Sequence, residues 1–147
     1  MELSSRRLVL EPLRVEHARE MVAVVGGYEG LDEAGLRERF ARQVAGRERG
    51  WLNWVVRMDG VAVGTVQASV TGSAAELAWV VAPPVRGRGI GGEAALAVVE
   101  WLRGQGVTRL CAHIAPSNGA SAGVARRLGL EPTDFVRVDG EVRWELA

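Results

Sequence analysis

The chain of 147 residues is long enough for one domain with a sizeable core, and 48% of its residues are hydrophobic. Its 18 basic and 18 acidic residues give a formal net charge of zero, which argues against a basic face that follows nucleic-acid phosphates. All the basic residues are arginine, so the chain has no lysine for a Walker A loop or a Schiff base.

The N-terminal part predicts one strand and two helices. Residues 6–13 read as a first strand, which Pro12 closes, and residues 15–25 show helical spacing. The glycine-containing stretch 26–30 ends this first helix. Asp32 is a suitable N-cap for a second helix over residues 33–45.

The middle of the chain predicts three antiparallel strands. Residues 51–57 and 61–70 are joined by Asp59-Gly60, which suits a two-residue hairpin turn. After a turn at Gly72-Ser73, residues 75–82 form the third strand of this run.

A helix of about fifteen residues follows and ends at Gly104 and Gly106. Its expected inner stripe has the spacing of a helix that lies on a sheet, and consists of Ile90, Ala94, Ala97, Val98 and Trp101. Residues 107–115 read as a buried strand, so that strand, helix and strand form a parallel crossover.

The chain closes with a helix and a hairpin. The helix spans residues 117–129, with Ser117 or Asn118 as its cap and Gly129 as a left-handed stop. The hairpin turns at Asp139-Gly140. The order of elements predicts a single α/β domain over residues 1–147 with a mixed central sheet.

Four glycines, Gly87, Gly89, Gly91 and Gly92, stand at the start of the long helix. A tight turn would explain one or two of them. The spacing of Gly87, Gly89 and Gly92 also matches a dinucleotide fingerprint, but residues 101–130 contain no Asp or Glu to hold a ribose. The favoured interpretation is an anion site, because a helix N-terminus presents free N–H groups, and Arg86 and Arg88 add charge. A diphosphate would use all of these groups.

The stretch Arg86 to Gly91 resembles the Arg/Gln-x-x-Gly-x-Gly/Ala signature of the GNAT N-acetyltransferases. The strand at 75–82 and the Asn-x-x-Ser helix from Asn118 resemble further parts of that family, so the resemblance runs essentially from end to end, and it is greatest for the branch that includes the ribosomal-protein N-terminal acetyltransferases. It implies a mostly antiparallel sheet of about seven strands with helices on both faces and a V-shaped splay between strands four and five. Pro83 and Pro84 agree with this splay, because they donate no hydrogen bonds and stop the pairing after Ala82.

The resemblance implies acetyl-CoA (coenzyme A) as co-substrate, with no metal, and direct acetyl transfer to a primary amine in a ternary complex. The residues that it assigns to the coenzyme are Trp79, Val80, Val81, Arg86, Gly87, Arg88, Gly89, Ile90, Gly91, Gly92 and Asn118. Arg126 and Arg127 either reach the coenzyme's phosphates or lie in solvent.

Glu76 matches the position of a general base in several family members, and the alternative is a strand carboxylate that faces solvent. A backbone N–H near Val81 would bind the developing oxyanion. The tyrosine that many members carry in the last helix is replaced here by Ala125. The thiolate would then take its proton from Ser121 or water, or leave directly, and both Ser121 and Asn118 also suit helix capping.

The acetyl acceptor is a small-molecule amine or a protein N-terminus. Tyr28, Glu29, Trp51 and Trp54 are candidates to line its site, although such tryptophans often belong to the core. His113 is expected as a core histidine and Cys111 as buried packing. A non-catalytic acyl-CoA-binding module of the same fold is the alternative function.

The remaining expectations concern location and partners. One cysteine and two distant histidines predict neither an internal disulfide nor a metal site. The N-terminus lacks the apolar region of a signal peptide, and no apolar run approaches the roughly 18 residues of a membrane helix. We therefore expect a cytoplasmic protein with no membrane or nucleic-acid partner. The family resemblance makes a homodimer an open alternative to a monomer.

Overall fold

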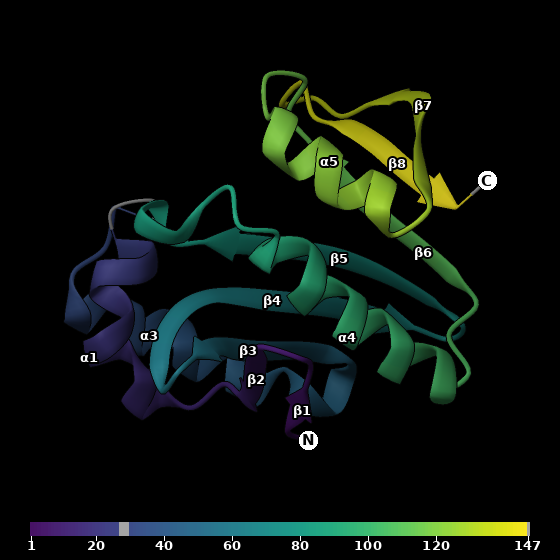
Figure 1. Ribbon diagram of the computed structural model, residues 1–147. Coiled ribbons are helices and arrows are strands. Elements are labelled where there is room, and N and C mark those ends of the chain that lie inside the picture. The colour runs from purple at the N-terminus through teal and green to yellow at the C-terminus, as the bar shows by residue number, and fades with distance from the viewer. Residues whose placement is uncertain (27–29, 147) are drawn as a thin grey trace.

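The computed structural model describes residues 1–26 and 30–146, which form an eight-stranded sheet with helices on both faces (Figure 1). The strands are β1 (Leu3–Ser4), β2 (Leu8–Pro12), β3 (Trp51–Met58), β4 (Val61–Thr71), β5 (Ala74–Val81), β6 (Arg109–Ile114), β7 (Leu130–Val136) and β8 (Val142–Leu146). The α-helices are α1 (Ala18–Met21), α3 (Glu33–Ala45), α4 (Ile90–Gly104) and α5 (Gly119–Arg127). Short 3₁₀ and π segments are η1 (Val15–His17), η2 (Val22–Gly26), η3 (Arg47–Arg49) and η4 (Pro83–Val85).

The strand order is β1-β2-β3-β4-β5-β6-β8-β7, and only β5 and β6 pair in parallel. The predicted α/β class with a mostly antiparallel sheet is therefore confirmed. The expected number of strands was one too low, because Leu3 and Ser4 pair with Leu10 and Val9 as an additional edge strand. Two residues are too short to show a strand pattern in the sequence.

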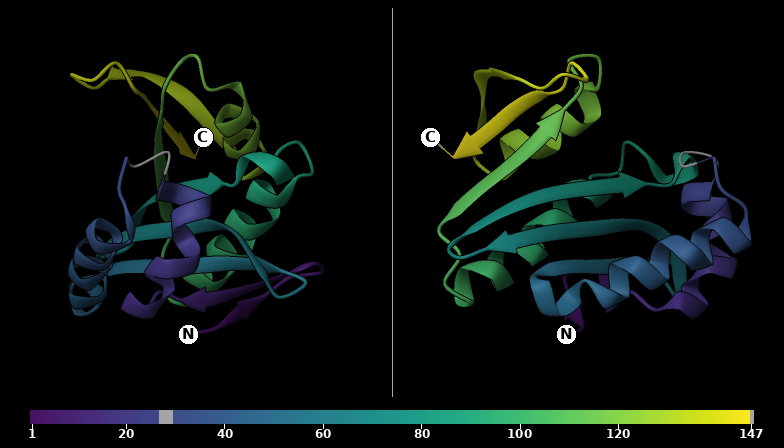
Figure 2. Two further views of the ribbon diagram at one scale, coloured as in Figure 1. Left: turned by 90° about the vertical axis from the view of Figure 1, so that its left-hand side faces the viewer. Right: turned by 180° about the vertical axis from the view of Figure 1, so that it is seen from behind.

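Helix α4 lies on one face of the sheet, and α1 and α3 lie on the other (Figures 1 and 2). The stripe predicted for α4 was partly wrong. Ala97 and Trp101 are only partly buried, whereas Ala95, Val99 and Leu102 are fully buried. Helix α5 also packs against α4, so the covered side of α4 is wider than the stripe that a sheet alone would bury.

Two local predictions are confirmed in detail. The Asp32 carboxylate accepts a hydrogen bond from the Gly35 N–H at 2.8 Å and caps α3, which spans the predicted range. Asp59 and Gly60 both adopt positive φ, of 52° and 80°, as a two-residue turn between antiparallel strands requires.

The predicted helix over residues 15–25 is present but irregular. It begins as the 3₁₀ segment η1, continues as the four-residue α1 and ends as the π segment η2. Three valines in residues 22–25 disfavour a regular α-helix, because β-branched side chains are restricted there. In the described residues we find no helix with the length and apolar character needed to cross a membrane.

Candidate active site

Strands β5 and β6 pair over only part of their length, which confirms the predicted splay. Residues Ala74–Leu77 of β5 pair with Arg109–Ala112 of β6, and the two strands then diverge (Figure 2). On its other side β5 stays paired with β4 as far as Val81. The second half of β5 is therefore a strand with one edge open.

Main-chain groups of β5 face this open edge. The Ala82 N–H donates to the Val63 oxygen at 2.8 Å, so Ala82 directs its groups toward β4. The main-chain N–H and C=O groups of successive residues point toward opposite edges of a strand. Those of Trp79 and Val81 therefore point toward the splay. In agreement, the Val81 oxygen accepts from Arg86 Nε at 3.1 Å instead of from β4.

A cavity of about 730 Å³ extends from the splay to the start of α4, and we call it the splay cavity. Its walls come from β5, the glycine-rich turn and α5. The lining residues are Trp79, Val80, Val81, Val85, Arg86, Gly87, Gly89, Ile90, Gly91, Gly92, Ser117, Asn118, Ala120, Ser121, Gly123, Val124 and Arg127. All residues that the sequence assigned to the coenzyme therefore lie together, except Arg88, which is not among the lining residues.

The four glycines serve two different purposes. Gly87 and Gly89 adopt positive φ, of 82° and 73°, which turns the chain into α4. Gly91 and Gly92 are helical and tightly packed: a Cβ on Gly91 would lie 3.2 Å from Val81 Cγ2, and one on Gly92 would lie 2.8 Å from Arg127 Cδ. Thus backbone conformation explains the first two glycines, and close packing explains the last two.

The N-terminus of α4 has no side-chain cap. Its first intrahelical bond runs from the Glu93 N–H to the Gly89 oxygen, so the N–H groups of Ile90, Gly91 and Gly92 precede the helical hydrogen bonding. These donors, at the positive end of the helix dipole, suit an anionic group in the splay cavity.

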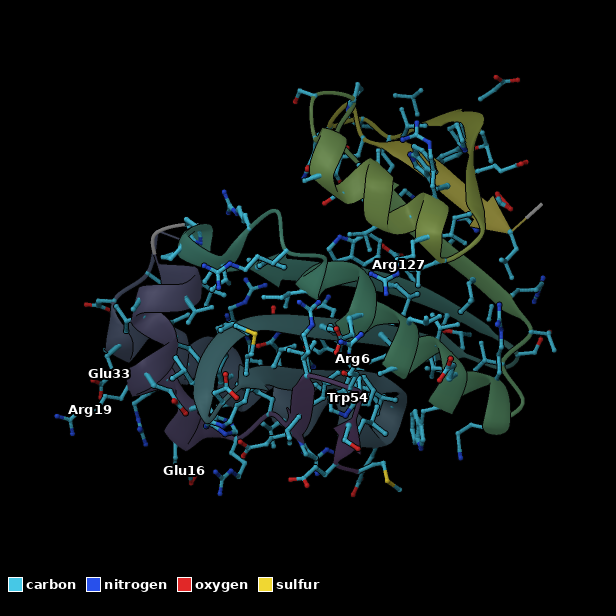
Figure 3. All side chains as sticks on the ribbon, viewed as in Figure 1. Arg6, Glu16, Arg19, Glu33, Trp54 and Arg127 are labelled. Atoms are coloured by element: carbon cyan, nitrogen blue, oxygen red, sulfur yellow. The ribbon has the colours of Figure 1, made fainter. Side chains whose placement is uncertain are left out.

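Arginine side chains hold this turn in place. Arg127 Nη1 of α5 donates to the Gly89 oxygen at 3.3 Å, and Figure 3 shows Arg127 between α5 and α4. Arg7 Nη2 donates to the Arg88 oxygen at 2.9 Å, and Arg7 also pairs with Glu93 at 2.7 Å. Burial alone would raise the pKa of Glu93, but hydrogen bonds from Ser5 and Arg7 outweigh it, so the pKa is lowered and the pair stays ionised.

The splay cavity also contains an unsatisfied donor. The indole Nε1 of Trp79 is buried and has no hydrogen-bond partner in the described part of the chain. A buried N–H without a partner costs roughly 1–3 kcal/mol, so a ligand carbonyl beside it would be favoured. The N–H groups that open α4 and the unpaired indole N–H of Trp79, a residue that lines the cavity, fit a ligand with a diphosphate and an amide-containing arm, as coenzyme A has.

A second cavity of about 280 Å³ lies on the face of the sheet that α3 covers, and we call it the acceptor cavity. Residues common to both cavities are Trp79, Val80, Asn118 and Ser121, so the two spaces adjoin at the splay. The Asn118 side chain caps α5 by accepting from the Ser121 N–H at 3.0 Å, which confirms its predicted capping position.

Glu76 and His113 form a pair in the acceptor cavity. His113 Nδ1 lies 3.0 Å from Glu76 Oε2, and Arg137 Nη1 lies 3.9 Å from the same oxygen. The His113 side chain is 8% exposed, and that of Glu76 is 46% exposed. His113 as a whole is only partly buried and lines the cavity, so it is not the core histidine that the sequence predicts, and it has a carboxylate partner that the sequence analysis missed. In the parallel register Glu76 lies opposite Cys111, which places His113 one step further along the same face.

The aromatic residues expected around the acceptor have other contacts. Trp54 borders the acceptor cavity, but its indole is in the core, where Nε1 donates to the Met1 oxygen and the ring packs edge-on against Trp101. Trp51 packs against Gly46 and lines neither cavity. These contacts do not support Trp51 or Trp54 as acceptor-binding side chains.

The other expectations concern Tyr28 and Glu29, Cys111, and a metal site. Tyr28 and Glu29 lie outside the described residues. Cys111 is buried as expected, and burial raises the pKa of its thiol. The described residues contain no cluster of His, Cys, Asp and Glu that could hold a metal ion.

Comparison with known proteins identifies the family. The model of the acetyltransferase (GNAT) domain matches residues 7–131. Comparison with curated protein sequences found no match.

Solved structures of acetyltransferases share the fold over nearly the whole chain. A Bordetella pertussis protein provisionally assigned to the GNAT family is 25% identical, with a TM-score of 0.84, and 100% of this chain and 99% of that chain are covered. RimJ of Mycobacterium smegmatis, in complex with CoA-disulfide, is 18% identical, with a TM-score of 0.85 and coverage of 99% and 87%. RimL, a ribosomal L7/L12 α-N-protein acetyltransferase in complex with coenzyme A, is 15% identical, with a TM-score of 0.83 and coverage of 96% and 94%. The match of the family model over most of the chain, together with the splayed α/β fold, shows that the chain belongs to the GNAT acetyltransferase family.

Proposed function

We propose that this protein transfers the acetyl group of acetyl-CoA to a primary amine, on a small molecule or a protein N-terminus, by direct attack in a ternary complex. One observation carries this proposal: the splay cavity, which suits coenzyme A, adjoins an acceptor cavity that contains the Glu76–His113 pair. Acetyl-CoA in the splay cavity and the amine in the acceptor cavity can then be bound at the same time. The names of RimL and RimJ and their coenzyme complexes support the choice of donor and acceptor.

The splay cavity would bind the coenzyme through three sets of groups. The N–H groups that open α4 and the side chain of Arg127 bind the diphosphate. The main-chain groups of Trp79 and Val81 bind the pantetheine arm in the manner of an added strand. The Val81 N–H then donates to the thioester oxygen, and loss of one such donor typically costs roughly 3 kcal/mol of barrier.

The amine loses its proton in the acceptor cavity. The amine nitrogen forms a bond to the acetyl carbon while the bond from that carbon to sulfur breaks. Glu76 acts as general base, and His113 at 3.0 Å stabilises its carboxylate and shares the proton that the amine loses. The thiolate takes up a proton from water, either directly or through the hydroxyl of Ser121, which lines both cavities and receives a proton from water as it passes its own on.

A non-catalytic acyl-CoA-binding module is the second candidate function. The observation that favours it is Ala125, which replaces the tyrosine of many family members and is 0% exposed, so that position offers no acid to the leaving thiolate.

Steady-state release of free thiol from acetyl-CoA, measured with a panel of primary amines, tests the proposal. Amine-dependent release that continues over many turnovers supports the enzyme. Tight binding of coenzyme A without turnover on any amine would support the binding module instead.

A further inference from the structure

Three neutral carboxamides gather on the wall of the acceptor cavity away from Glu76. They are Gln43 of α3, Asn53 of β3 and Gln67 of β4, which we call the carboxamide cluster. Asn53 lies directly opposite Gln67, so these two side chains share one face of the sheet. Gln67 lies opposite Ala78, two residues beyond Glu76 on β5, which is about 7 Å along the strand.

The cluster is incompletely hydrogen-bonded. Gln43 Nε2 donates to Asn53 Oδ1 at 3.1 Å and makes a longer contact of 3.5 Å with Gln67 Oε1. Gln43 Oε1 and Asn53 Nδ2 are buried and have no partner among the described residues. If all three amides are rotated by 180°, the bonds reverse, and one donor and one acceptor are again left unpaired. The cluster therefore has one unpaired NH₂ group and one unpaired C=O in either orientation.

The unpaired atoms of the cluster cost folding free energy, because their surroundings are buried and largely apolar. Gln43 is only 5% exposed, and Leu13, Val25 and Phe40 contribute apolar surface to the same cavity. Unsatisfied polar atoms buried in this way are rare, and each one costs roughly 1–3 kcal/mol, as for the indole of Trp79. All three residues line the acceptor cavity, and rotation about their terminal amide torsions, which are soft, would bring the unpaired atoms to its surface.

The geometry points to a subsite for a neutral amide group of the acetyl acceptor; this inference rests on the proposed function. An amide group has one carbonyl and at least one N–H, which match the unpaired N–H and C=O of the cluster. Among the described residues, the carboxylates that line the acceptor cavity are Glu76 of β5 and Glu141, which precedes β8, so a second cationic group would find no counter-ion in the cluster. The acceptor is thus an α-amine followed by an amide, as in an amino-acid amide or the first residue of a peptide.

Two acceptors of nearly equal shape test this inference. L-Alaninamide has the amide, and L-alanine methyl ester keeps the carbonyl but lacks the N–H. The ratio of their kcat/KM values is measured for the wild type and for Gln43→Leu, with Gln105→Leu, at an exposed position after α4, as matched control. We expect the wild type to prefer the amide by roughly five- to thirty-fold, Gln43→Leu to bring the ratio close to one, and Gln105→Leu to keep it. Asn53→Leu takes the place of Gln43→Leu if that variant does not fold.

A second measurement needs neither turnover nor a variant. L-Alaninamide is added to the ¹⁵N-labelled wild type with coenzyme A, and the side-chain amide signals of Gln43 and Asn53 are followed by NMR. Shifted signals without turnover would keep the subsite and refute the proposed transferase. Turnover without preference for the amide would refute the subsite and keep the transferase. Unshifted signals would also refute the subsite, because the cluster then binds only an internal water or nothing.

Discussion

His113 Nδ1 lies 3.0 Å from Glu76 Oε2, although the two residues are 37 positions apart and belong to different strands. The contact exists because β5 and β6 still pair in parallel at Glu76, just before they diverge. The pair therefore lies where the splay begins, next to the residues that line both cavities. Its position makes it the strongest candidate for the proton acceptor in the proposed transfer.

We expect Glu76→Gln to lower kcat/KM for amine acetylation by roughly 10²- to 10⁴-fold, as is usual for the loss of a general base. His113→Asn should have an effect of the same order, and the double variant should be little worse than the more damaged single variant, because the two groups act as one unit. Initial rates of thiol release measure all three, with Glu100→Gln, an exposed residue of α4, as control. Fully additive losses would contradict the proposed joint action.

The glycine-rich turn gives a prediction about coenzyme binding. Gly89→Asp places a carboxylate at the N-cap of α4, and Gly91→Asp places one beside Val81, so both variants repel the diphosphate. We expect both to abolish measurable binding of coenzyme A by titration calorimetry while the protein still folds. Both variants should also be less stable than the wild type, because the Cβ of Gly91→Asp meets Val81 and Val124 at 3.2 and 3.3 Å, and Gly89→Asp has to adopt a φ of 73°, which is strained for a residue with a side chain.

Gly104→Asp is the matched control for these variants, since it lies at the other end of α4 and a Cβ there meets nothing within 4 Å. It should bind coenzyme A as the wild type does. Unchanged affinity in Gly89→Asp and Gly91→Asp would remove the diphosphate from this turn.

Arg127 gives a prediction that separates phosphate binding from the rest of the coenzyme. Loss of its charge and of its bond to the Gly89 oxygen in Arg127→Leu should weaken coenzyme A binding by roughly 10- to 100-fold, which corresponds to about 1.4–2.7 kcal/mol. The KM for acetyl-pantetheine, which lacks the diphosphate, should change much less. Arg103→Leu, near the end of α4, is the control. An equal loss for both donors would mean that Arg127 acts only on the structure of the turn.

The sequence was most informative where one short segment determines the structure. Asp32 predicted the start of α3, and Asp59-Gly60 predicted a hairpin turn, because a cap and a turn depend on a few adjacent residues. The glycine signature likewise predicted where the splay cavity lies. The sequence did not predict contacts between residues of different elements. The Glu76–His113 pair, for example, depends on the parallel register of two strands that are joined by a helix.

The same limit explains two other results. The carboxamide cluster brings together Gln43, Asn53 and Gln67 from three elements, and no spacing in the sequence predicts these contacts. Trp54 is a candidate for the acceptor site in the sequence analysis, with packing in the core as the alternative. Which face of β3 carries its indole is decided by pairing and packing, here against Trp101 of α4.

A final prediction concerns stability at acid pH and the buried His17, which is 2% exposed. Burial lowers the pKa of His17 below its ordinary value of 6.5, and the positive charge of Arg14 adds to this effect. The unfolded chain therefore binds a proton more readily than the folded protein, and the free energy of unfolding should fall as the pH drops below about 6.5. Glu11 and Glu20 act in the same direction at lower pH, because hydrogen bonds from Arg57 lower the pKa of both carboxyl groups, and their stabilisation is lost as they become protonated.

Urea unfolding at a series of pH values between 8 and 5 measures this dependence in the wild type and in His17→Gln. The variant has no titrating group at this position, so its unfolding free energy should be lower at pH 8 but should decline less between pH 7 and pH 5. The matched control is His113→Gln, which removes the other histidine of the chain and should leave the contribution of His17 intact. Parallel curves for the wild type and His17→Gln would show that His17 is not the source of the acid sensitivity in this range, and the loss would then have to begin with the carboxylates of the Arg57 network at lower pH.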